Sequence, residues 1–233
     1  MVAFKALLGE WLAALGRWRL LAALATAVAL AWLGPQLAST RKPAFDMAVL
    51  DAVHSAIPDA LGPVLISVYQ LSGKHVGAVL VLAVVIFLAL RRFWADLVCL
   101  AIGTGGILLI VDRGLKPFFE RRRPTGRLLD AISGRSFPSG HAAGSVVLYF
   151  LTCCLLSAHY PRLRRPLFLI SSVWVGLVWL STLYVRAHWL TDIAAGAALG
   201  YVWLSFCLAG FTVWEHHQAR RLSTRSDSPA SHG

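Results

Sequence analysis

A charged stretch, Lys116-Pro-Phe-Phe-Glu-Arg-Arg-Arg-Pro124, separates two long apolar segments, and Pro138-Ser-Gly-His141 closes the same interval. This interval carries two acids and six basic residues, namely Lys116, Arg121, Arg122, Arg123, Arg127 and Arg135. The planar fork of donors on arginine suits phosphate, and lysine adds a mobile point charge. The interval therefore predicts a loop between two apolar helices that holds an anion.

The Pro-Ser-Gly-His segment adds three groups that suit such a site. Ser139 supplies a hydroxyl, Gly140 a flexible backbone whose N–H can turn toward an oxyanion, and His141 an imidazole. Residues 142–158 have the pattern of a helix, so we expect His141 at its N-terminal end, where the helix dipole favours anions.

The composition is that of a membrane protein. The chain has 233 residues, of which 58% are hydrophobic and only 14% charged, and its mean hydropathy is +0.67. The net charge of +11 is explained by basic residues in short loops between spans, so nucleic acid is not an expected partner. The four cysteines lie inside apolar runs, in neither a disulfide nor a zinc pattern.

Six apolar runs predict an all-α polytopic membrane protein with six transmembrane helices plus short interfacial helices. Several runs are shorter than the ~20 residues that a bilayer core prefers, and flanking aromatic and small residues can extend them. The runs are Leu20–Leu33, His75–Leu90, Leu97–Val111, Ala142–Ala158, Leu167–Tyr184 and Ile193–Val213.

The remaining segments complete the predicted domain organisation. Residues 1–18 have helically spaced apolar side chains that indicate an interfacial helix. Residues 19–214 form the six-span domain, with the first run as an uncleaved anchor. Within this domain, prolines and a glycine break residues 44–70 into short surface helices. Residues 215–233 are polar and are predicted to be a disordered tail.

The distribution of charge gives an expected orientation in a bacterial-type inner membrane. A plain count of Lys and Arg gives the same number on each side. When the residues of the candidate site are set aside, the balance favours both termini in the cytoplasm and the site on the periplasmic face.

The loop between the fifth and sixth runs contains a candidate nucleophile. Two spans separate this loop from the charged loop that contains Lys116 and His141, so both loops lie on the same face of the membrane. The loop contains His188 and Asp192. Residues four apart share a helix face, so the carboxylate can orient the imidazole and raise its basicity. Either histidine alone is better explained as a polar cap, but both together beside a basic loop indicate function.

These residues carry a family resemblance. The chain resembles the type 2 phosphatidic acid phosphatase superfamily, whose motifs are K-x6-R-P, P-S-G-H and S-R-x5-H-x3-D. The first motif matches at Lys116, Arg123 and Pro124, and the second at residues 138–141. The third matches at Ser181, His188 and Asp192.

The resemblance implies a role for each matching residue. His188 would attack phosphorus and form a phospho-histidine, Asp192 would orient it, and His141 would protonate the leaving oxygen. Lys116, Arg123, Ser139 and the Gly140 amide would bind the phosphoryl oxygens. Phosphoryl transfer needs mainly positioning and charge stabilisation, which clustered cations supply.

The chain departs from the third motif at Thr182, where the family has arginine. Threonine keeps a hydroxyl donor but loses the charge and the fork. If the helix continues through this segment, Arg186 shares a face with Thr182 and could return a guanidinium to the phosphate. The alternative is that Arg186 extends toward lipid headgroups.

The expected function is therefore a membrane lipid phosphate phosphatase that uses no metal or other cofactor. A metal site built from the two histidines and Asp192 lacks a known ligand spacing. Candidate substrates are undecaprenyl diphosphate, phosphatidic acid and phosphatidylglycerol phosphate. Two alternatives stay open: a lipid phosphotransferase that uses the same site, and a non-catalytic lipid-binding protein. The sequence also leaves the oligomeric state open.

Overall fold

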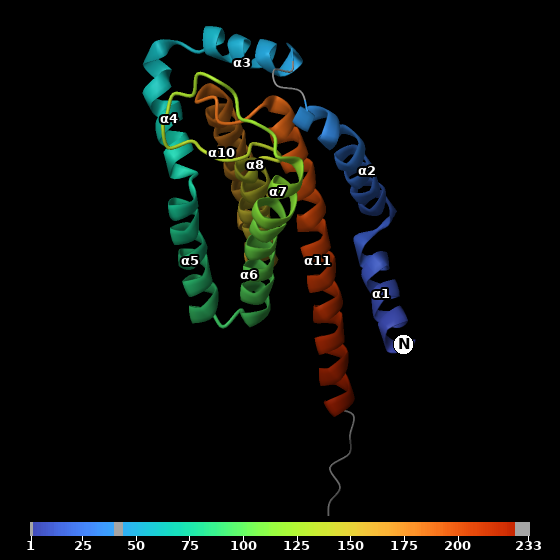
Figure 1. Ribbon diagram of the computed structural model, residues 1–233. Coiled ribbons are helices and arrows are strands. Elements are labelled where there is room, and N and C mark those ends of the chain that lie inside the picture. Colours follow the sequence, from blue (N-terminus) through green and yellow to red (C-terminus); the bar gives the residue numbers. More distant parts are fainter. Residues whose placement is uncertain (1, 40–43, 227–233) are drawn as a thin grey trace, which may run out of the picture.

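The computed structural model describes residues 2–39 and 44–226, and every regular element in those residues is a helix (Figure 1). The first helices are α1 (Val2–Leu15), α2 (Arg17–Ser39), α3 (Ala44–Ala56), α4 (Gly62–Leu71) and α5 (Lys74–Leu90). The others are α6 (Trp94–Leu108), α7 (Lys116–Phe119), α8 (Gly140–Ser145), α9 (Leu151–His159), α10 (Arg164–Tyr184) and α11 (Leu190–Ser226). The all-α prediction is confirmed.

Two π-helical segments join some of these helices into longer continuous helices. A π-helical segment, Leu109–Leu115, joins α6 to α7, and a second, Val146–Phe150, joins α8 to α9. Five helical stretches in the described residues are then long and apolar enough to cross a membrane, or six if one bent pair counts as a span. The five are Arg17–Leu37, Trp94–Phe119, Gly140–His159, Pro161–Tyr184 and Leu190–Arg220.

The bent pair lies in the segment predicted to form short surface helices. Ala44–Ala56 and Asp59–Leu71 meet at an angle of 97°, and Pro58 stands at the bend. Figure 1 shows α3 lying across one end of the bundle, while α4 turns down its side and leads into α5. The predicted run at His75–Leu90 is thus a shorter apolar helix that continues α4.

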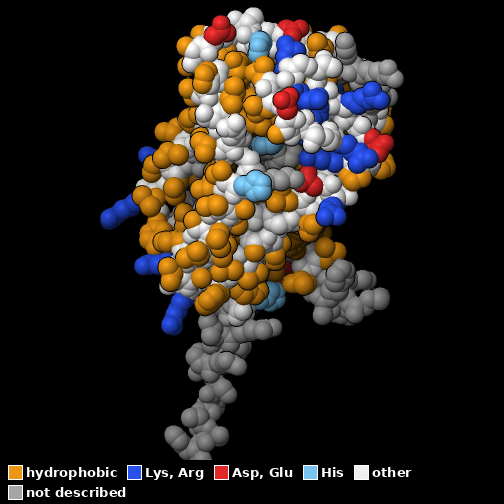
Figure 2. All heavy atoms as spheres, turned by 60° about the vertical axis from the view of Figure 1, so that its left-hand side comes forward, with side chains coloured by type: hydrophobic (Ala, Val, Ile, Leu, Met, Phe, Trp, Pro, Cys, Tyr) orange, Lys and Arg blue, Asp and Glu red, His pale blue; other side chains and the backbone are white. Residues whose placement is uncertain are grey.

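The core lies where α6, α8, α9, α10 and α11 pack together. Leu100, Val147 and Leu151 are fully buried there. Other large apolar side chains face outward, such as Ile102 and Leu169, which are 57% and 65% exposed. Figure 2 shows hydrophobic side chains over much of this face and charged ones gathered mostly toward its upper end. This distribution suits a helical bundle surrounded by lipid.

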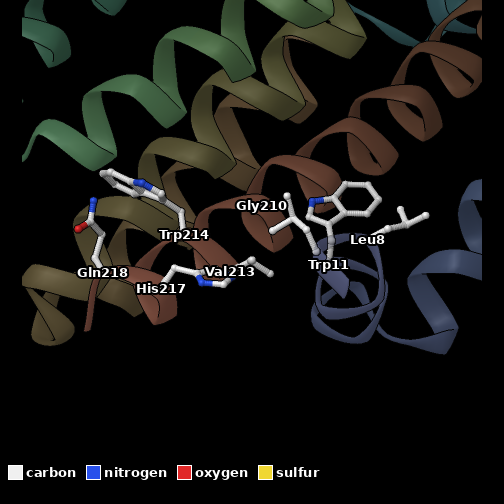
Figure 3. Close-up of a pocket in the computed structure, with 8 residues that line it drawn as sticks. Leu8, Trp11, Gly210, Val213, Trp214, His217 and Gln218 are labelled. Atoms are coloured by element: carbon white, nitrogen blue, oxygen red, sulfur yellow. The ribbon is translucent and has the colours of Figure 1, made fainter. Parts of the chain in front are cut away.

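The helix predicted to be interfacial at residues 1–18 corresponds to α1, which runs lengthwise beside α11 (Figure 1). The rings of Trp11 and Phe206 stack with centroids 4.7 Å apart, and Glu10 Oε2 lies 2.7 Å from His217 Nε2. A cavity of ≈ 570 Å³ opens between the two helices (Figure 3).

The predicted disordered tail at residues 215–233 is wrong as far as Ser226, because α11 continues to that residue. Good helix formers such as Gln218, Ala219 and Arg220 follow the last apolar turn and prolong the helix. The contact between Glu10 and His217 also holds this part of α11 against α1. Residues 227–233 of the predicted tail lie outside the described residues.

Candidate active site

The three motif segments meet at the end of the bundle that α3 crosses. Lys116 begins α7, Gly140 begins α8, and His188 lies between α10 and α11. A Cβ placed on Gly140 would lie 3.5 Å from Lys116 Nζ. The backbone N–H of Ser139 donates to the carbonyl oxygen of Asp192 over 3.0 Å. The rings of His141 and His188 are 6.0 Å apart, centroid to centroid.

The pairing of His188 with Asp192 is present, but it does not arise on one helix as predicted. His188 lies in the loop that follows α10, and α11 begins only at Leu190. The two residues approach because Asp192 Oδ2 accepts a hydrogen bond of 3.0 Å from the Trp189 N–H, which folds the loop over the helix end. His188 Nδ1 then lies 3.5 Å from the same oxygen.

The environment of His188 keeps its imidazole neutral. The side chain is 1% exposed, and burial lowers the pKa of His188, an effect that Arg123 and Lys116 reinforce and Asp192 opposes. Arg123 Nη1 lies 3.3 Å from His188 Nε2. Because arginine has only donors, this contact requires a lone pair on Nε2 and places the proton on Nδ1, toward Asp192. In this tautomer Nε2 carries the free lone pair of the ring.

Arg123 is fixed by the two loops that it joins. Its Nε donates to the Ser133 carbonyl over 2.9 Å, and Nη1 donates to the Ala187 carbonyl over 2.6 Å. Burial lowers the pKa of Arg123, but a guanidinium starts so high that it stays charged. The result is a fixed cation held beside His188.

Lys116 lies on the other side of this cluster. Its ammonium donates to Asp112 Oδ1 over 2.7 Å, and its side chain is 16% exposed. Ser139 is fully buried, and its hydroxyl caps α8 by accepting from the Ala142 N–H over 3.2 Å. Gly140 lies within ordinary contact distance of Lys116. The structure thus brings together Lys116, Arg123, Ser139, Gly140 and both histidines.

The two remaining candidates lie differently. The Thr182 hydroxyl donates to the Trp179 carbonyl over 2.8 Å, so its one donor is used within α10. The premise for Arg186 is wrong, because α10 ends at Tyr184 and Arg186 adopts a left-handed backbone with φ of +55°. Its guanidinium donates to Asp51 Oδ1 over 2.8 Å, on the side of α3.

Three residues at the site were not identified from the sequence. Arg121 stands among the unspecified x positions of the K-x6-R-P motif, yet it is buried and bonded to Asp192 and Asp46. Tyr69 of α4 stacks on His141 with ring centroids 5.0 Å apart. The only signal for Asp46 was its place as one of two acids in the largely apolar helix α3, and Arg121 offered none beyond its motif. Tyr69 offered no signal.

Within residues 2–39 and 44–226, no group of three or more His, Cys, Asp or Glu side chains is placed to hold a metal ion. The charge near His188 is supplied by Arg123 and Lys116 instead. Arg123 contacts Nε2 directly, and both cations lower the pKa of His188.

The fold and the site define a polytopic helical membrane protein with a buried His–Asp pair inside a cationic cradle. The model of the PAP2 superfamily matches residues 97–215, and the chain belongs to this superfamily. Phosphatidylglycerophosphatase B of Bacillus subtilis (strain 168) is 34% identical over 125 residues, which cover 52% of this chain and 60% of that protein. The alignment thus spans less than two thirds of that relative.

A solved structure shares the fold. It is the crystal structure of a transmembrane PAP2-type phosphatidylglycerolphosphate phosphatase from Bacillus subtilis. The match has a TM-score of 0.64 and 24% sequence identity, and it covers 82% of this chain and 96% of the other. The helical arrangement is therefore that of a PAP2 membrane protein.

Proposed function

We propose that this protein is a lipid phosphate phosphatase that hydrolyses a phosphomonoester through a phospho-histidine on His188. One observation carries the proposal: Nε2 of a buried, neutral His188 lies 3.3 Å from the fixed guanidinium of Arg123, while Asp192 lies behind Nδ1. A nucleophile, a phosphate-binding cation and an orienting carboxylate are thus aligned.

In the first half-reaction, phosphate oxygens displace the contact between Arg123 and Nε2. They are held by Arg123, Lys116, the Ser139 hydroxyl and the Gly140 N–H. His188 Nε2 forms a bond to phosphorus as the bond from phosphorus to the lipid oxygen breaks. His141, in its protonated form, gives that oxygen a proton, so the lipid leaves as an alcohol.

In the second half-reaction, the now neutral His141 accepts a proton from water, whose oxygen attacks phosphorus. The bond from phosphorus to Nε2 breaks, inorganic phosphate leaves, and His141 is again protonated. The His141 ring stacks on Tyr69 and lies 6.0 Å from the His188 ring, a spacing that supports this role.

Phosphatidylglycerol phosphate is the first substrate to test, because the relatives reported above bear that activity in their names. Phosphatidic acid and undecaprenyl diphosphate complete the panel. The protein would be purified in detergent with EDTA, and phosphate release by wild type would be compared with His188→Ala. His216→Ala, an exposed histidine near the far end of α11, is the matched control.

Release by wild type and His216→Ala, with none by His188→Ala, is the expected result. Labelled substrate should leave an acid-labile phosphoryl group on wild type and on His216→Ala, but not on His188→Ala. Equal release by wild type and His188→Ala would refute His188 as nucleophile. Consumption of labelled substrate without release of phosphate, with the label appearing on an added acceptor lipid, would indicate a phosphotransferase.

We further propose that the site faces the periplasm and both termini face the cytoplasm of a bacterial-type inner membrane. The turns at the opposite end support this, because Arg91 and Arg92 lie between α5 and α6, and Arg162 lies between α9 and α10. Labelling of intact cells with a membrane-impermeant maleimide tests it: Ser133→Cys should react and Arg162→Cys should not. The reverse pattern would refute this orientation.

A further inference from the structure

A buried arginine links the orienting carboxylate to a helix outside the family match. Arg121 is 1% exposed, and its Nη1 donates to Asp192 Oδ1 over 2.5 Å. Its Nη2 donates to Asp46 Oδ2 over 2.8 Å, and both carboxylates are fully buried. Asp46 belongs to α3, whereas the family model begins only at residue 97.

Asp46 also holds the first turn of α11. Its Oδ1 accepts from the Thr191 N–H over 3.0 Å, and its Oδ2 accepts from the Thr191 hydroxyl over 2.7 Å. Arg121 Nη1 reaches the same hydroxyl over 2.7 Å. Because α11 begins at Leu190, Thr191 N–H is one of the amides that no turn of the helix satisfies. The residue next to Asp192 is therefore fixed from α3.

We propose that Arg121 and Asp46 are positioning residues that set the direction and the effective charge of the Asp192 carboxylate, and through it the state of His188. This inference rests on the proposed function of the site. Arg121 takes Oδ1 of Asp192, which leaves Oδ2 for Trp189 N–H and for His188. A buried ion pair is weak evidence for stability, so its place beside the nucleophile calls for another role.

The proposal predicts opposite changes for the two partners. The charged groups near His188 are Arg123, Lys116 with its partner Asp112, and Asp192, and the His141 ring lies 6.0 Å away. Removing the charge of Arg121 leaves Asp192 uncompensated, which stabilises a protonated His188 and raises its pKa. Removing the charge of Asp46 leaves more of the Arg121 charge for Asp192, which lowers the pKa of His188.

The variants are Arg121→Met, Arg121→Lys and Asp46→Asn. Two other ion pairs supply matched controls. Arg135→Met removes the exposed pair with Glu120 in the same loop, and Asp51→Asn, at an exposed residue of α3, removes the pair with Arg186. Folding is checked by size exclusion and thermal unfolding. The pKa of His188 is measured by NMR with labelled histidine, and kcat/KM for phosphatidylglycerol phosphate is measured against pH.

We expect the pKa of His188 to rise by on the order of one unit in Arg121→Met and to fall in Asp46→Asn. The acid limb of kcat/KM should move in the same directions. Arg121→Lys should restore the pKa but only part of kcat, because lysine keeps the charge and loses the fork. At neutral pH, Arg121→Met should lose about 10²-fold in kcat with KM nearly unchanged.

A pKa for His188 equal to that of wild type in both Arg121→Met and Asp46→Asn would overturn the inference. So would a kcat for Arg121→Met equal to that of Arg135→Met. If Arg121→Met does not fold, Asp46→Asn keeps the side-chain volume and decides alone. The NMR measurement needs no turnover, so a wild type without phosphatase activity would refute the proposed function while the NMR result still tests this inference.

Discussion

Replacing Gly196 with alanine tests whether the contact between α8 and α11 holds the site in register. Gly196 lies one helical turn beyond Asp192, where the start of α8 crosses α11. A Cβ on Gly196 would lie 2.4 Å from the carbonyl oxygen of Ser139 and 3.2 Å from the Ala142 side chain. Ordinary contact begins at 3.4 Å, so the two backbones must separate by about 1 Å (3.4 minus 2.4).

This separation would displace residues that take part in the proposed mechanism. The Ser139 carbonyl also accepts from the Ala143 N–H over 3.1 Å, so it cannot turn away without loosening α8. The Ser139 N–H donates to the Asp192 carbonyl over 3.0 Å, and that bond would break or stretch. A misplacement of ~1 Å costs about 10²-fold in rate, and overpacking costs about 1–3 kcal/mol in stability.

The assay is kcat/KM for lipid phosphate hydrolysis in detergent, with thermal unfolding measured on the same samples. Gly144→Ala is the control, because it lies in α8 and a Cβ there would meet nothing within 4 Å. This control should keep its activity and its stability, since alanine favours the helix. A folded Gly196→Ala with the kcat/KM of Gly144→Ala would refute the reasoning, because the close approach would then not position the site.

Three further predictions follow from the site. Burial lowers the pKa of His188 from its ordinary 6.5, so the folded state binds fewer protons than the unfolded one. Stability should then fall as pH drops below about 6.5, and less steeply in His188→Asn, as thermal unfolding against pH would show. Arg123→Lys should lose about 10²–10³-fold in kcat because the fork that spans two carbonyls is gone; an activity like that of wild type would contradict this. Arg186→Ala should keep an activity close to that of wild type, because Asp51 holds its guanidinium; a large loss in kcat/KM would restore Arg186 as a phosphate ligand.

The helices and the convergence of the motifs could be predicted because both follow from the apolar runs and from their order along the chain. An apolar run long enough for a bilayer forms a helix wherever its neighbours lie, and alternating spans bring two loops to one face. The contact between His188 and Asp192 was predicted for a reason that proved wrong. Residues four apart met because the Trp189 N–H binds the carboxylate in a loop, a detail of backbone geometry that helical spacing does not give.

The role of Arg121 could not be predicted, because its partner Asp46 lies 75 residues away along the chain. The sequence gives no reason to distinguish Arg121 from the two arginines that follow it. Only their packing in the folded protein differs. Arg122 is exposed, whereas Arg121 lies between the rings of Trp189 and Phe137, whose centroids are 5.6 and 6.0 Å from its Cζ. Burial selects which cation becomes structural, and burial is a property of the whole fold.

Asp192 explains why the three motifs must fold together to make one site. Its backbone carbonyl accepts from the N–H of Ser139 in the second motif, and its Oδ1 accepts from Arg121 in the first motif. Its Oδ2 faces His188, which belongs to the third motif, as Asp192 does. Each bond uses a different atom, so the residue can serve all three at once. Asparagine could replace the carboxylate sterically, but its amide nitrogen would face either the Arg121 guanidinium or the Trp189 N–H, donor against donor. Asp192→Asn should therefore disturb the first motif as well as His188. We expect its loss of kcat/KM to be larger than the removal of a single contact to His188 would cause.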